Sequence, residues 1–275
     1  MINKIIRNLK MAISAPLRST KPSYRGANNK TVKILANGPS LKTDFGSLIP
    51  TDEILVLNNF FLHEKFYIYK PQYYVIVDPM YFEEKFWRGL PDENIYKVIV
   101  NINWDITFFI PYKYYDYFRS KVNNPHVSIK TLYRYPFLHS FFPSKIECIL
   151  YKLGISCPTT QNVLIPSIYA MINMGFSKIY LYGTDHSWTS QLLVNHLNQV
   201  CISDSHFYDE NECSLQPWLK ANGAPYRMHE ILYDLSNAFK TYHELENYAS
   251  YISPIGGISI INKTKKSFID AFVKE

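Results

Sequence analysis

From residue 31 onward, short apolar segments alternate with longer stretches of helical periodicity, and this alternation constrains the fold most. Strands and helices in such alternation build an α/β domain around a mostly parallel sheet. Six segments have the length and the composition of buried strands. They are Val32–Ala36, Ile54–Leu57, Tyr73–Val77, Val98–Ile102, Ile179–Tyr182 and Ile258–Ile261.

A polar residue or a glycine stands close behind each predicted strand, where the next loop begins. Ligands of open α/β sheets bind outside the carboxyl ends of the strands, so these are natural site positions. Each of them also fits an ordinary turn, and their value lies in the set. The six residues are Asn37, Asn58, Asp78, Asn103, Gly183 and Asn262.

The turn Asn37–Ser40 follows the first predicted strand and opens a helix. Gly38 lets a ligand approach the backbone closely, and Pro39 suits the first position of a helix. Ser40 adds a hydroxyl beside free backbone N–H groups, which is a geometry that suits a phosphate. The same residues also fit a simple capped turn, and the two interpretations stay open at this point.

Two segments have the periodicity of helices that pack on the sheet. Residues Thr160–Phe176 carry a broad apolar face that Gly175 is placed to end, and Ile231–Tyr251 carry a second apolar stripe. The segment between them, residues 188–226, is polar, aromatic and irregular, which is typical of a lid or a functional loop.

We therefore expect one nucleotide-binding α/β domain, a flexible lid and a basic leader. The domain would consist of residues 31–187 and 227–275, and the lid of residues 188–226 would cover its active site.

The formal net charge of +6 is concentrated in residues 1–30, which contain seven basic residues and no acid. The rest of the chain is close to neutral, so a nucleic-acid partner is not expected. Interspersed apolar residues would let this leader lie on an anionic membrane surface, and a disordered leader is the alternative. No segment has the ~18–20 apolar residues of a membrane span.

Missing motifs narrow the chemistry further. The four cysteines show no C-x-x-C spacing, which favours a reduced, cytoplasmic chain and argues against a zinc site. There is no Asp-x-Asp pair, no Gly-x-x-x-x-Gly-Lys loop and no Gly-x-Gly-x-x-Gly fingerprint. ATP hydrolysis and NAD chemistry lose support, and nucleotide binding by backbone, Asn and Ser groups remains.

Two histidines are candidates for a general base. His186 follows Asp185 at the end of a predicted strand, where Asp185 could accept hydrogen bonds from a sugar or orient a neighbour. His229 is the stronger candidate, because it precedes the helix 231–251 and the positive end of the helix dipole favours a neutral imidazole. A structural histidine at either position is the alternative.

These segments together resemble the bacterial CMP-sialic-acid sialyltransferases of glycosyltransferase family 42, within the wider group of polysaccharide-locus and motility-associated-factor glycosyltransferases. The resemblance runs from about residue 31 to 272. It rests on Asn37–Leu41, on Asn58-Asn59-Phe60, on Gly175-Phe176 with Ile179–Asp185, and on His229. It implies a GT-A-like variant, with a mostly parallel Rossmann-type sheet flanked by helices and a small lid.

The resemblance also implies a metal-independent, inverting transfer from a CMP-activated donor to a hydroxyl of a cell-surface glycan. The sugar would be sialic acid, another nonulosonic acid or Kdo, and the acceptor an oligosaccharide or a glycolipid. The CMP-sugar is a co-substrate, and no cofactor is expected.

Residue roles carry over from the family by position. His229 would take the proton of the acceptor hydroxyl, with Asp185 in the same catalytic site. Asn37 and Ser40 would approach the phosphate and nucleotide, and Asn58 and Asn59 the nucleotide or donor. The other residues expected at the substrate site are Gly38, Asp78, Thr160, Gln161, Asn162, Gly183, Thr184, His186, Ser187, Trp188, Tyr208, Tyr226 and Arg227.

Three departures leave the donor sugar and the base open. Asp78 stands where the family has an Asn that contacts the ribose, and residues 159–162 replace a Thr-Ser-Gly sequence. A lid tyrosine of the family falls near Ser187, which leaves Tyr208, Tyr226 or Arg227 for that contact. The ending Ile261-Asn262-x-Thr264-x-x-Ser267 looks more like the wider polysaccharide-locus group.

Two other functions stay open. One is a pterin-type pyrophosphokinase, against which the missing acidic pair argues. The other is a non-catalytic nucleotide-sugar-binding component of a glycan assembly complex. For the leading interpretation we expect a bacterial protein of lipopolysaccharide or capsule biosynthesis. It would act at the inner face of the cytoplasmic membrane, held there by residues 1–30. A homo-oligomer is one of the oligomeric states that the sequence leaves open.

Overall fold

The structure is a computed structural model that describes residues 30–49, 52–83, 95–132, 144–158, 162–202, 216–220, 223–253 and 257–275. Several sequence predictions lie outside these residues. They are the leader up to residue 29, the site candidates Thr160, Gln161 and Tyr208, and parts of the predicted lid.

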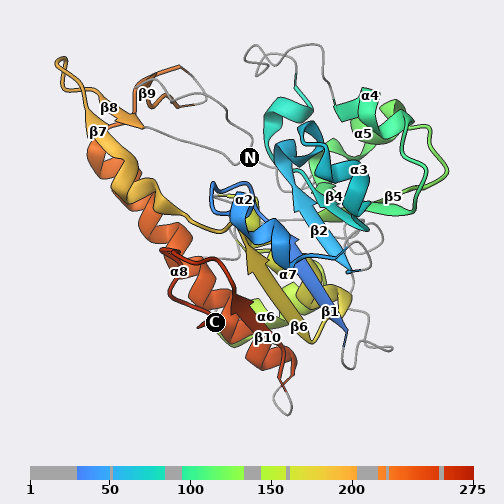
Figure 1. Cartoon of the computed structure of the whole chain (residues 1–275). Coiled ribbons are helices and arrows are strands. Elements are labelled where there is room, and N and C mark those ends of the chain that lie inside the picture. The colour runs from blue at the N-terminus through green and yellow to red at the C-terminus, as the bar shows by residue number, and fades with distance from the viewer. Residues whose placement is uncertain are drawn as a thin grey trace, which may run out of the picture.

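An eight-stranded sheet forms the centre of the described chain (Figure 1). All of its paired strands run parallel, so the predicted α/β class with a mostly parallel sheet is confirmed. In spatial order the strands are β11 (Val273–Lys274), β10 (Ser259–Asn262), β6 (Lys178–Tyr182), β1 (Thr31–Leu35), β2 (Ile54–Leu57), β3 (Tyr73–Val75), β4 (Ile106–Pro111) and β5 (Val127–Leu132).

The strand order reverses between β1 and β6. The chain runs outward from β1 to β5 and then returns to the opposite side of β1 with β6, followed by β10 and β11. Sheets of this kind bind ligands outside the carboxyl ends of the strands at such a switch point. The topology therefore directs attention to the turn after β1 and the loop after β6.

Successive strand residues point to opposite faces and build two cores. In β1, Val32 and Ile34 belong to one core and Leu35 belongs to the other. Helices α6 (Ser144–Lys152), α7 (Leu164–Met174) and α8 (Met228–Ile252) contribute to the first core. Helices α3 (Lys65–Tyr69), α4 (Ile95–Val100) and α5 (Tyr115–Lys121) contribute to the second.

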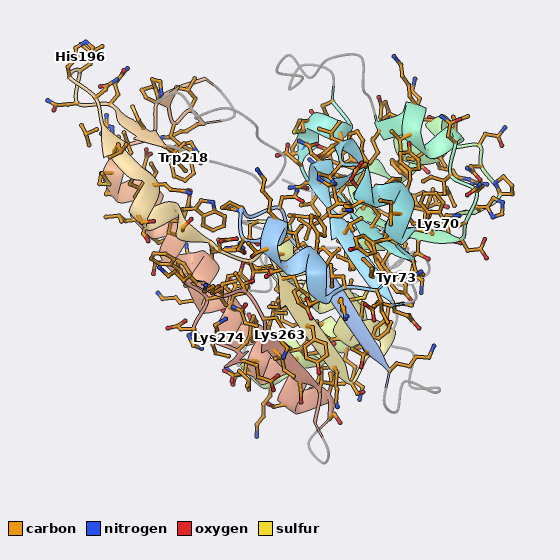
Figure 2. The ribbon with its side chains drawn as sticks, in the orientation of Figure 1. Lys70, Tyr73, His196, Trp218, Lys263 and Lys274 are labelled. Atoms are coloured by element: carbon orange, nitrogen blue, oxygen red, sulfur yellow. The ribbon has the colours of Figure 1, made fainter. Side chains whose placement is uncertain are left out.

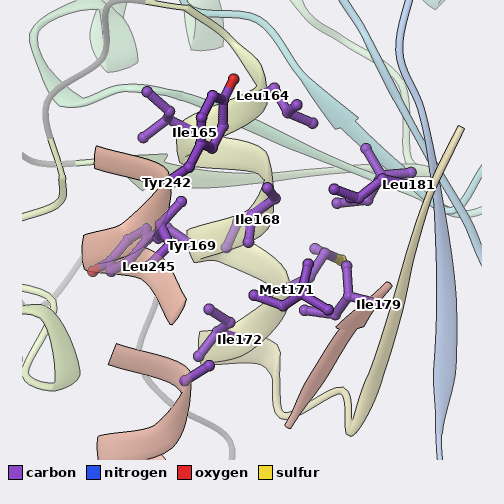
Figure 3. Close-up of a cluster of buried hydrophobic side chains, with 14 of the residues drawn as sticks. Leu164, Ile165, Ile168, Tyr169, Met171, Ile172, Ile179, Leu181, Tyr242 and Leu245 are labelled. Atoms are coloured by element: carbon purple, nitrogen blue, oxygen red, sulfur yellow. The ribbon is translucent and has the colours of Figure 1, made fainter. Parts of the chain in front are cut away.

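Helix α7 is the central element of the first core. All its residues except Met174 are buried, because it lies between the sheet and α8. Figure 3 shows Ile168 and Met171 of α7 close to Ile179 of β6, with Tyr242 and Leu245 of α8 on the other side. Each fully buried side chain of this size contributes about 1.5–3 kcal/mol. None of the helices in the described ranges is long and apolar enough to cross a membrane.

One predicted strand is wrong. Residues 98–100 belong to α4, whose buried side chains Ile95 and Ile99 are four positions apart while Val100 is exposed. A short apolar run does not distinguish a strand from a helix, and here the spacing of four decides for the helix. Asn103 therefore follows no strand. The strands that continue the sheet beyond β3 are β4 and β5, which the sequence did not predict.

The other predicted elements exist. Five predicted strands are present with ends shifted by at most about two residues, a normal boundary error. The predicted helix 160–176 is α7, and Gly175 ends it with φ 89° as predicted. The predicted helix 231–251 begins earlier, at Met228, so His229 lies inside its first turn instead of before it.

The described part of residues 188–226 is more regular than predicted. The 3-10 helix η6 (Ser187–Gln191) leads into β7 (Leu192–Val194), β8 (Val200–Ile202) and β9 (Gln216–Pro217), which form a small antiparallel sheet. Val200 packs with Ile231 and Leu235 of α8, and Trp218 lies on the same sheet (Figure 2). This small sheet therefore stands against the first turns of α8, apart from the main sheet.

Candidate functional site

The carboxylate of Asp185, which belongs to the loop after β6, contacts the turn that follows β1. Its Oδ2 accepts hydrogen bonds from the hydroxyl of Ser40 at 2.8 Å and from the backbone N–H of Ser40 at 3.4 Å. The N–H of Gly38 donates to the carbonyl of Gly183 at 2.9 Å. The turn after β1 is thus docked on the loop after β6, at the switch point of the sheet.

Gly38 is required by this docking. A Cβ at that position would lie 2.0 Å from Oδ2 of Asp185 and 2.5 Å from the carbonyl oxygen of Gly183. The turn therefore holds an anion, as its N–H and hydroxyl groups predict, but in this structure the anion belongs to the protein. Ser40 acts here on Asp185.

Asp44, on the short helix α2 (Leu41–Asp44), adds a second carboxylate that the sequence predictions did not include. Its Oδ2 accepts the N–H of Gly183 at 3.2 Å. Burial raises the pKa of Asp44, and the charge of Asp185 adds to that rise. The signal in the sequence is a carboxylate one helical turn after Ser40. Among the described residues, no group of three or more His, Cys, Asp or Glu side chains has the geometry of a metal site.

Asn37 and Asn58 present amide oxygens at the ends of two adjacent strands. Nδ2 of Asn37 donates to the carbonyl of Leu57 at 3.2 Å, which ties the end of β1 to the end of β2. The Oδ1 atoms of Asn37 and Asn58 are buried and have no hydrogen-bond partner within the described ranges. A buried acceptor without a partner costs about 1–3 kcal/mol. These two oxygens therefore suit the N–H or O–H groups of a ligand.

The backbone of Asn58 is held in an uncommon conformation. Its φ is 47°, in the left-handed region that Asn tolerates better than most residues. Its carbonyl accepts the hydroxyl of Tyr74 at 2.5 Å, and the same hydroxyl accepts the N–H of Phe61 at 3.1 Å. The buried Tyr74 on β3 therefore orients the loop after β2.

Asn59 and Asp78 have structural partners instead. Oδ1 of Asn59 accepts the hydroxyl of Tyr81 at 2.5 Å. Oδ1 of Asp78 accepts the N–H of Met80 at 2.9 Å and caps the 3-10 helix η3 (Pro79–Tyr81). Both residues follow their strands at the expected edge of the sheet. The contact of Asp78 is local, and that of Asn59 joins the loop after β2 to the loop after β3.

A second polar group lies at the N-terminus of α7. Oδ1 of Asn162 accepts the N–H groups of Leu164 and Ile165 at 3.0 and 3.2 Å, and the hydroxyl of Tyr242 at 3.1 Å. Its Nδ2 is buried and has no partner in the described part of the chain. The hydroxyl of Tyr242 also lies 3.3 Å from Nδ1 of His186. Tyr242 was predicted only as part of an apolar stripe, so its polar role comes from the structure.

The imidazole of His186 is neutral at pH 7. It packs edge-on against Trp188, with 4.3 Å between the ring centroids, and against Tyr242. Burial lowers the pKa of His186 to about 3. A general base works best with a pKa near the operating pH, so this histidine is suited to hydrogen bonding and not to proton abstraction.

His229 lies apart from both groups. Its side chain is exposed in the first turn of α8, where the N–H of Arg227 donates to Oε2 of Glu230 at 2.9 Å. The helix rise places His229 roughly 20 Å from Tyr242 along the axis of α8. Within the part of the chain that the structure describes, no hydrogen bond or ion pair joins it to Asp185. Tyr226 packs on Trp218 of the small sheet, at the same end of α8.

The predicted site residues that the structure describes, apart from Asn59 and Asp78, thus fall into three groups. The first joins Asn37, Gly38, Ser40, Asn58, Gly183, Thr184 and Asp185 at the switch point. The second joins Asn162, His186 and Trp188, with Ser187 at the start of η6, and the third holds Tyr226, Arg227 and His229 beside the small sheet.

The fold and these groups define a class: a doubly wound α/β protein with a polar site at the switch point of its sheet. No protein-family model and no curated protein matches the chain. Among solved structures, the chain is similar to the sialyltransferase CstII from Campylobacter jejuni in complex with a substrate analogue, cytidine-5'-monophosphate. The two share 16% sequence identity with a TM-score of 0.46, over 90% of this chain and 86% of that chain. This likeness is too distant to identify an activity.

Proposed function

We propose that the protein is a glycosyltransferase that takes a sugar from a CMP-activated donor. One observation carries the proposal. The buried oxygens Oδ1 of Asn37 and Asn58 lie at the switch point, beside the contact between Ser40 and Asp185, and have no partner among the described residues. They lie at the edge of the sheet where doubly wound folds bind nucleotides. The resemblance of the sequence motifs to the family 42 sialyltransferases supports the same activity.

The chemistry of these groups favours the nucleoside or sugar part of the ligand at this place. Amide oxygens accept from hydroxyl and amino groups, and a phosphate next to the Asp185 carboxylate would be repelled. Nδ2 of Asn162 is a donor, which suits an oxygen of the same ligand. A nucleotide sugar carries both kinds of group. Ser40 would then act through Asp185.

The transfer we propose is a single inverting displacement without a metal. The acceptor oxygen forms a bond to the anomeric carbon, the bond from that carbon to the phosphate oxygen breaks, and the electron pair leaves with CMP. The hydroxyl proton passes to His229. The neutral imidazole of His186 then acts only as a hydrogen-bonding group. Because His229 lies roughly 20 Å along α8 from Tyr242, the sugar and acceptor would extend from the switch point toward the small sheet. We propose a cell-surface oligosaccharide or glycolipid as the acceptor class.

Nucleotide binding is the first test. The purified protein is titrated with CMP, CDP, UDP, GDP and ATP in a thermal-shift assay, since a ligand stabilises the fold in proportion to its affinity. Asn58→Gly removes the amide and keeps the positive φ, so it should weaken CMP binding by about tenfold, the equivalent of one lost hydrogen bond.

Asn198→Gly is the matched control. Asn198 also has a positive φ, 55°, but lies in the exposed β7–β8 hairpin. It should bind CMP as the wild type does. Equal stabilisation by UDP or ATP, or unchanged CMP affinity in Asn58→Gly, would contradict the donor assignment. Activity that requires ATP and Mg²⁺ would point to a pyrophosphokinase, and CMP binding without any turnover to a binding component.

Transfer is the second test, with CMP-sialic acid and CMP-Kdo as donors and release of CMP as the readout. His229→Gln should lower kcat by about 10²–10⁴-fold, the usual contribution of a general base, with a small effect on the donor KM. His243→Gln is the control, because His243 is exposed on the same helix beside Glu246 and Asp270. Full activity of His229→Gln would remove this residue from the mechanism and leave the binding test intact. Activity retained in EDTA is expected.

A further inference from the structure

A fully buried polar network joins the loop after β6 to the segment that follows β10. Thr184, Asn262 and Thr264 are each 0% exposed. The N–H of Thr184 donates to Oγ1 of Thr264 at 2.9 Å, and the hydroxyl of Thr184 donates to Oδ1 of Asn262 at 3.1 Å. The two threonine hydroxyls are 2.9 Å apart. The last ladder contact nearby is the N–H of Lys263 to the carbonyl of Leu181, so the network continues the strand pairing with side chains.

The directions of these hydrogen bonds are determined. Oδ1 of Asn262 also accepts the backbone N–H of Thr264 at 3.1 Å. A backbone N–H can only donate, so the oxygen of the amide and not its nitrogen faces it. The hydroxyl proton of Thr184 goes to the same oxygen, and the hydroxyl of Thr264 therefore donates to Oγ1 of Thr184. The network has one consistent arrangement.

The same segment also holds the carbonyl groups of the loop. The hydroxyl of Ser267 donates to the carbonyl of Thr184 at 2.5 Å, and the N–H of Phe268 donates to the carbonyl of Asp185 at 3.0 Å. Lys274 of the edge strand β11 donates to the carbonyl of Asn262 at 3.4 Å and to that of Thr264. The C-terminal segment is thereby tied down at both ends.

The opposite side of the loop is held by the turn after β1. Gly183 donates to Asp44 and accepts from Gly38, and the carboxylate of Asp185 accepts from Ser40. Asp185 is only partly buried, so water competes for its carboxylate and the Ser40 contact alone contributes modestly. The position of this carboxylate therefore depends on the backbone of the loop.

We infer that Asn262, Thr264 and Ser267 are positioning residues for the loop after β6, residues 183–185. They hold residues 183–185 so that Asp185 stays on Ser40 and the turn that carries Asn37 keeps its place. Only the expected effect of these three residues on binding of the sugar nucleotide rests on the proposed function. Their effect on the position of the loop is independent of any ligand.

Thr264→Val tests the inference, because it keeps the shape and removes the hydroxyl that serves the N–H and the Oγ1 of Thr184. Thr264→Ser keeps that hydroxyl. Thr131→Val is the matched control, since Thr131 is also 0% exposed but lies on β5 at the far edge of the sheet. If Thr264→Val does not fold, Ser267→Ala removes a less buried donor of the same segment.

Hydrogen–deuterium exchange of the peptide that covers residues 183–185 is the first readout. Thr264→Val should exchange at least tenfold faster than the wild type, and Thr264→Ser and Thr131→Val should stay within threefold. Equal exchange in Thr264→Val and Thr131→Val would overturn the inference. This measurement decides the inference even if the wild type binds no CMP, a result that would refute only the proposed function.

The affinity for CMP and the steady-state constants for the CMP-sugar are the second readout. Thr264→Val should weaken CMP binding and raise the donor KM at least fivefold, more than it lowers kcat, and Thr264→Ser should restore both. A purely structural role would lower the melting temperature without this split. A wild type that binds CMP, with faster exchange but unchanged affinity in Thr264→Val, would overturn the inference.

Discussion

Replacing Gly38 by alanine should strongly destabilise the protein through a single added methyl group. The new Cβ would lie 2.0 Å from Oδ2 of Asp185, 2.9 Å from its Cγ and 2.5 Å from the carbonyl oxygen of Gly183. The backbone of Gly38 lies outside the left-handed region, so alanine is not excluded by conformation and the penalty is steric.

The magnitude follows from what has to move. Asp185 must leave Ser40, and because this carboxylate is only partly buried, the loss of the hydrogen bond costs about 0.5–1.5 kcal/mol. The backbone at Gly183 must also shift, and overpacking of this kind costs about 1–3 kcal/mol. We expect a total of about 1.5–4.5 kcal/mol, which lowers the folding equilibrium constant at least about tenfold.

Urea unfolding followed by circular dichroism measures this effect. Gly46→Ala is the matched control: nothing lies within 4 Å of its added Cβ, so its free energy of unfolding should stay within about 0.5 kcal/mol of the wild type. In an Asp185→Ala background the cost of Gly38→Ala should fall by about 0.5–1.5 kcal/mol, because only the carbonyl contact remains. A Gly38→Ala protein as stable as Gly46→Ala, or a cost unchanged in that background, would refute the argument.

Stability should decrease as the pH falls below about 6.5, because burial lowers the pKa of His186 to about 3 and the unfolded chain therefore binds the proton first. Urea titrations from pH 7 to 4 should show up to about 1.4 kcal/mol per pH unit from this group, and His186→Gln should lack that part of the slope; identical slopes would contradict the pKa shift. For Asp44 the sign is opposite: burial raises its pKa above 3.8, so ionisation disfavours the folded state, and the stability of Asp44→Asn relative to the wild type should improve as the pH rises from 4 to 7. The reverse trend in the same titrations would show that the carboxylate is stabilised where it lies. Gly183→Ala should cost more than Gly223→Ala, because both have a positive φ (64° and 82°) but only the Cβ at 183 meets a neighbour, the carbonyl of Ala36 at 2.6 Å. Equal losses in thermal melts of the two variants would mean that the Ala36 contact relaxes freely.

The elements that the sequence predicts well are those whose pattern is local and complete. Ile54–Leu57 is a buried run of the right length, and Gly175 ends its helix as a glycine in the left-handed region does. The strand predicted at Val98–Ile102 is wrong, because a short apolar run fits a strand as well as a buried helix and residues 98–100 belong to α4. β4 and β5 were missed because their apolar residues do not stand out from the aromatic segments around them.

The candidate site was predictable residue by residue but not contact by contact. Asn37, Asn58 and Asp185 were expected at the carboxyl edge of the sheet, and all three lie there. Tyr242 and Thr264 were not expected in polar roles. Tyr242 belongs to the apolar stripe of a helix and Thr264 to an unassigned C-terminal motif, and neither pattern reveals a distant partner.

The sequence by itself determined that this chain is an α/β protein and that polar residues stand where its strands end, because periodicity and turn chemistry act between near neighbours. Only the tertiary structure decided which of these ends meet. Ser40 and Asp185 are 145 positions apart, and they touch because β6 returns to the free side of β1. This strand order places the apolar side chains of both faces of the sheet under helices. Because of the same order, the turn after β1, whose N–H and hydroxyl groups suit a phosphate, binds the carboxylate of Asp185. The side-chain oxygens of Asn37 and Asn58 lie beside this contact and are available to a ligand.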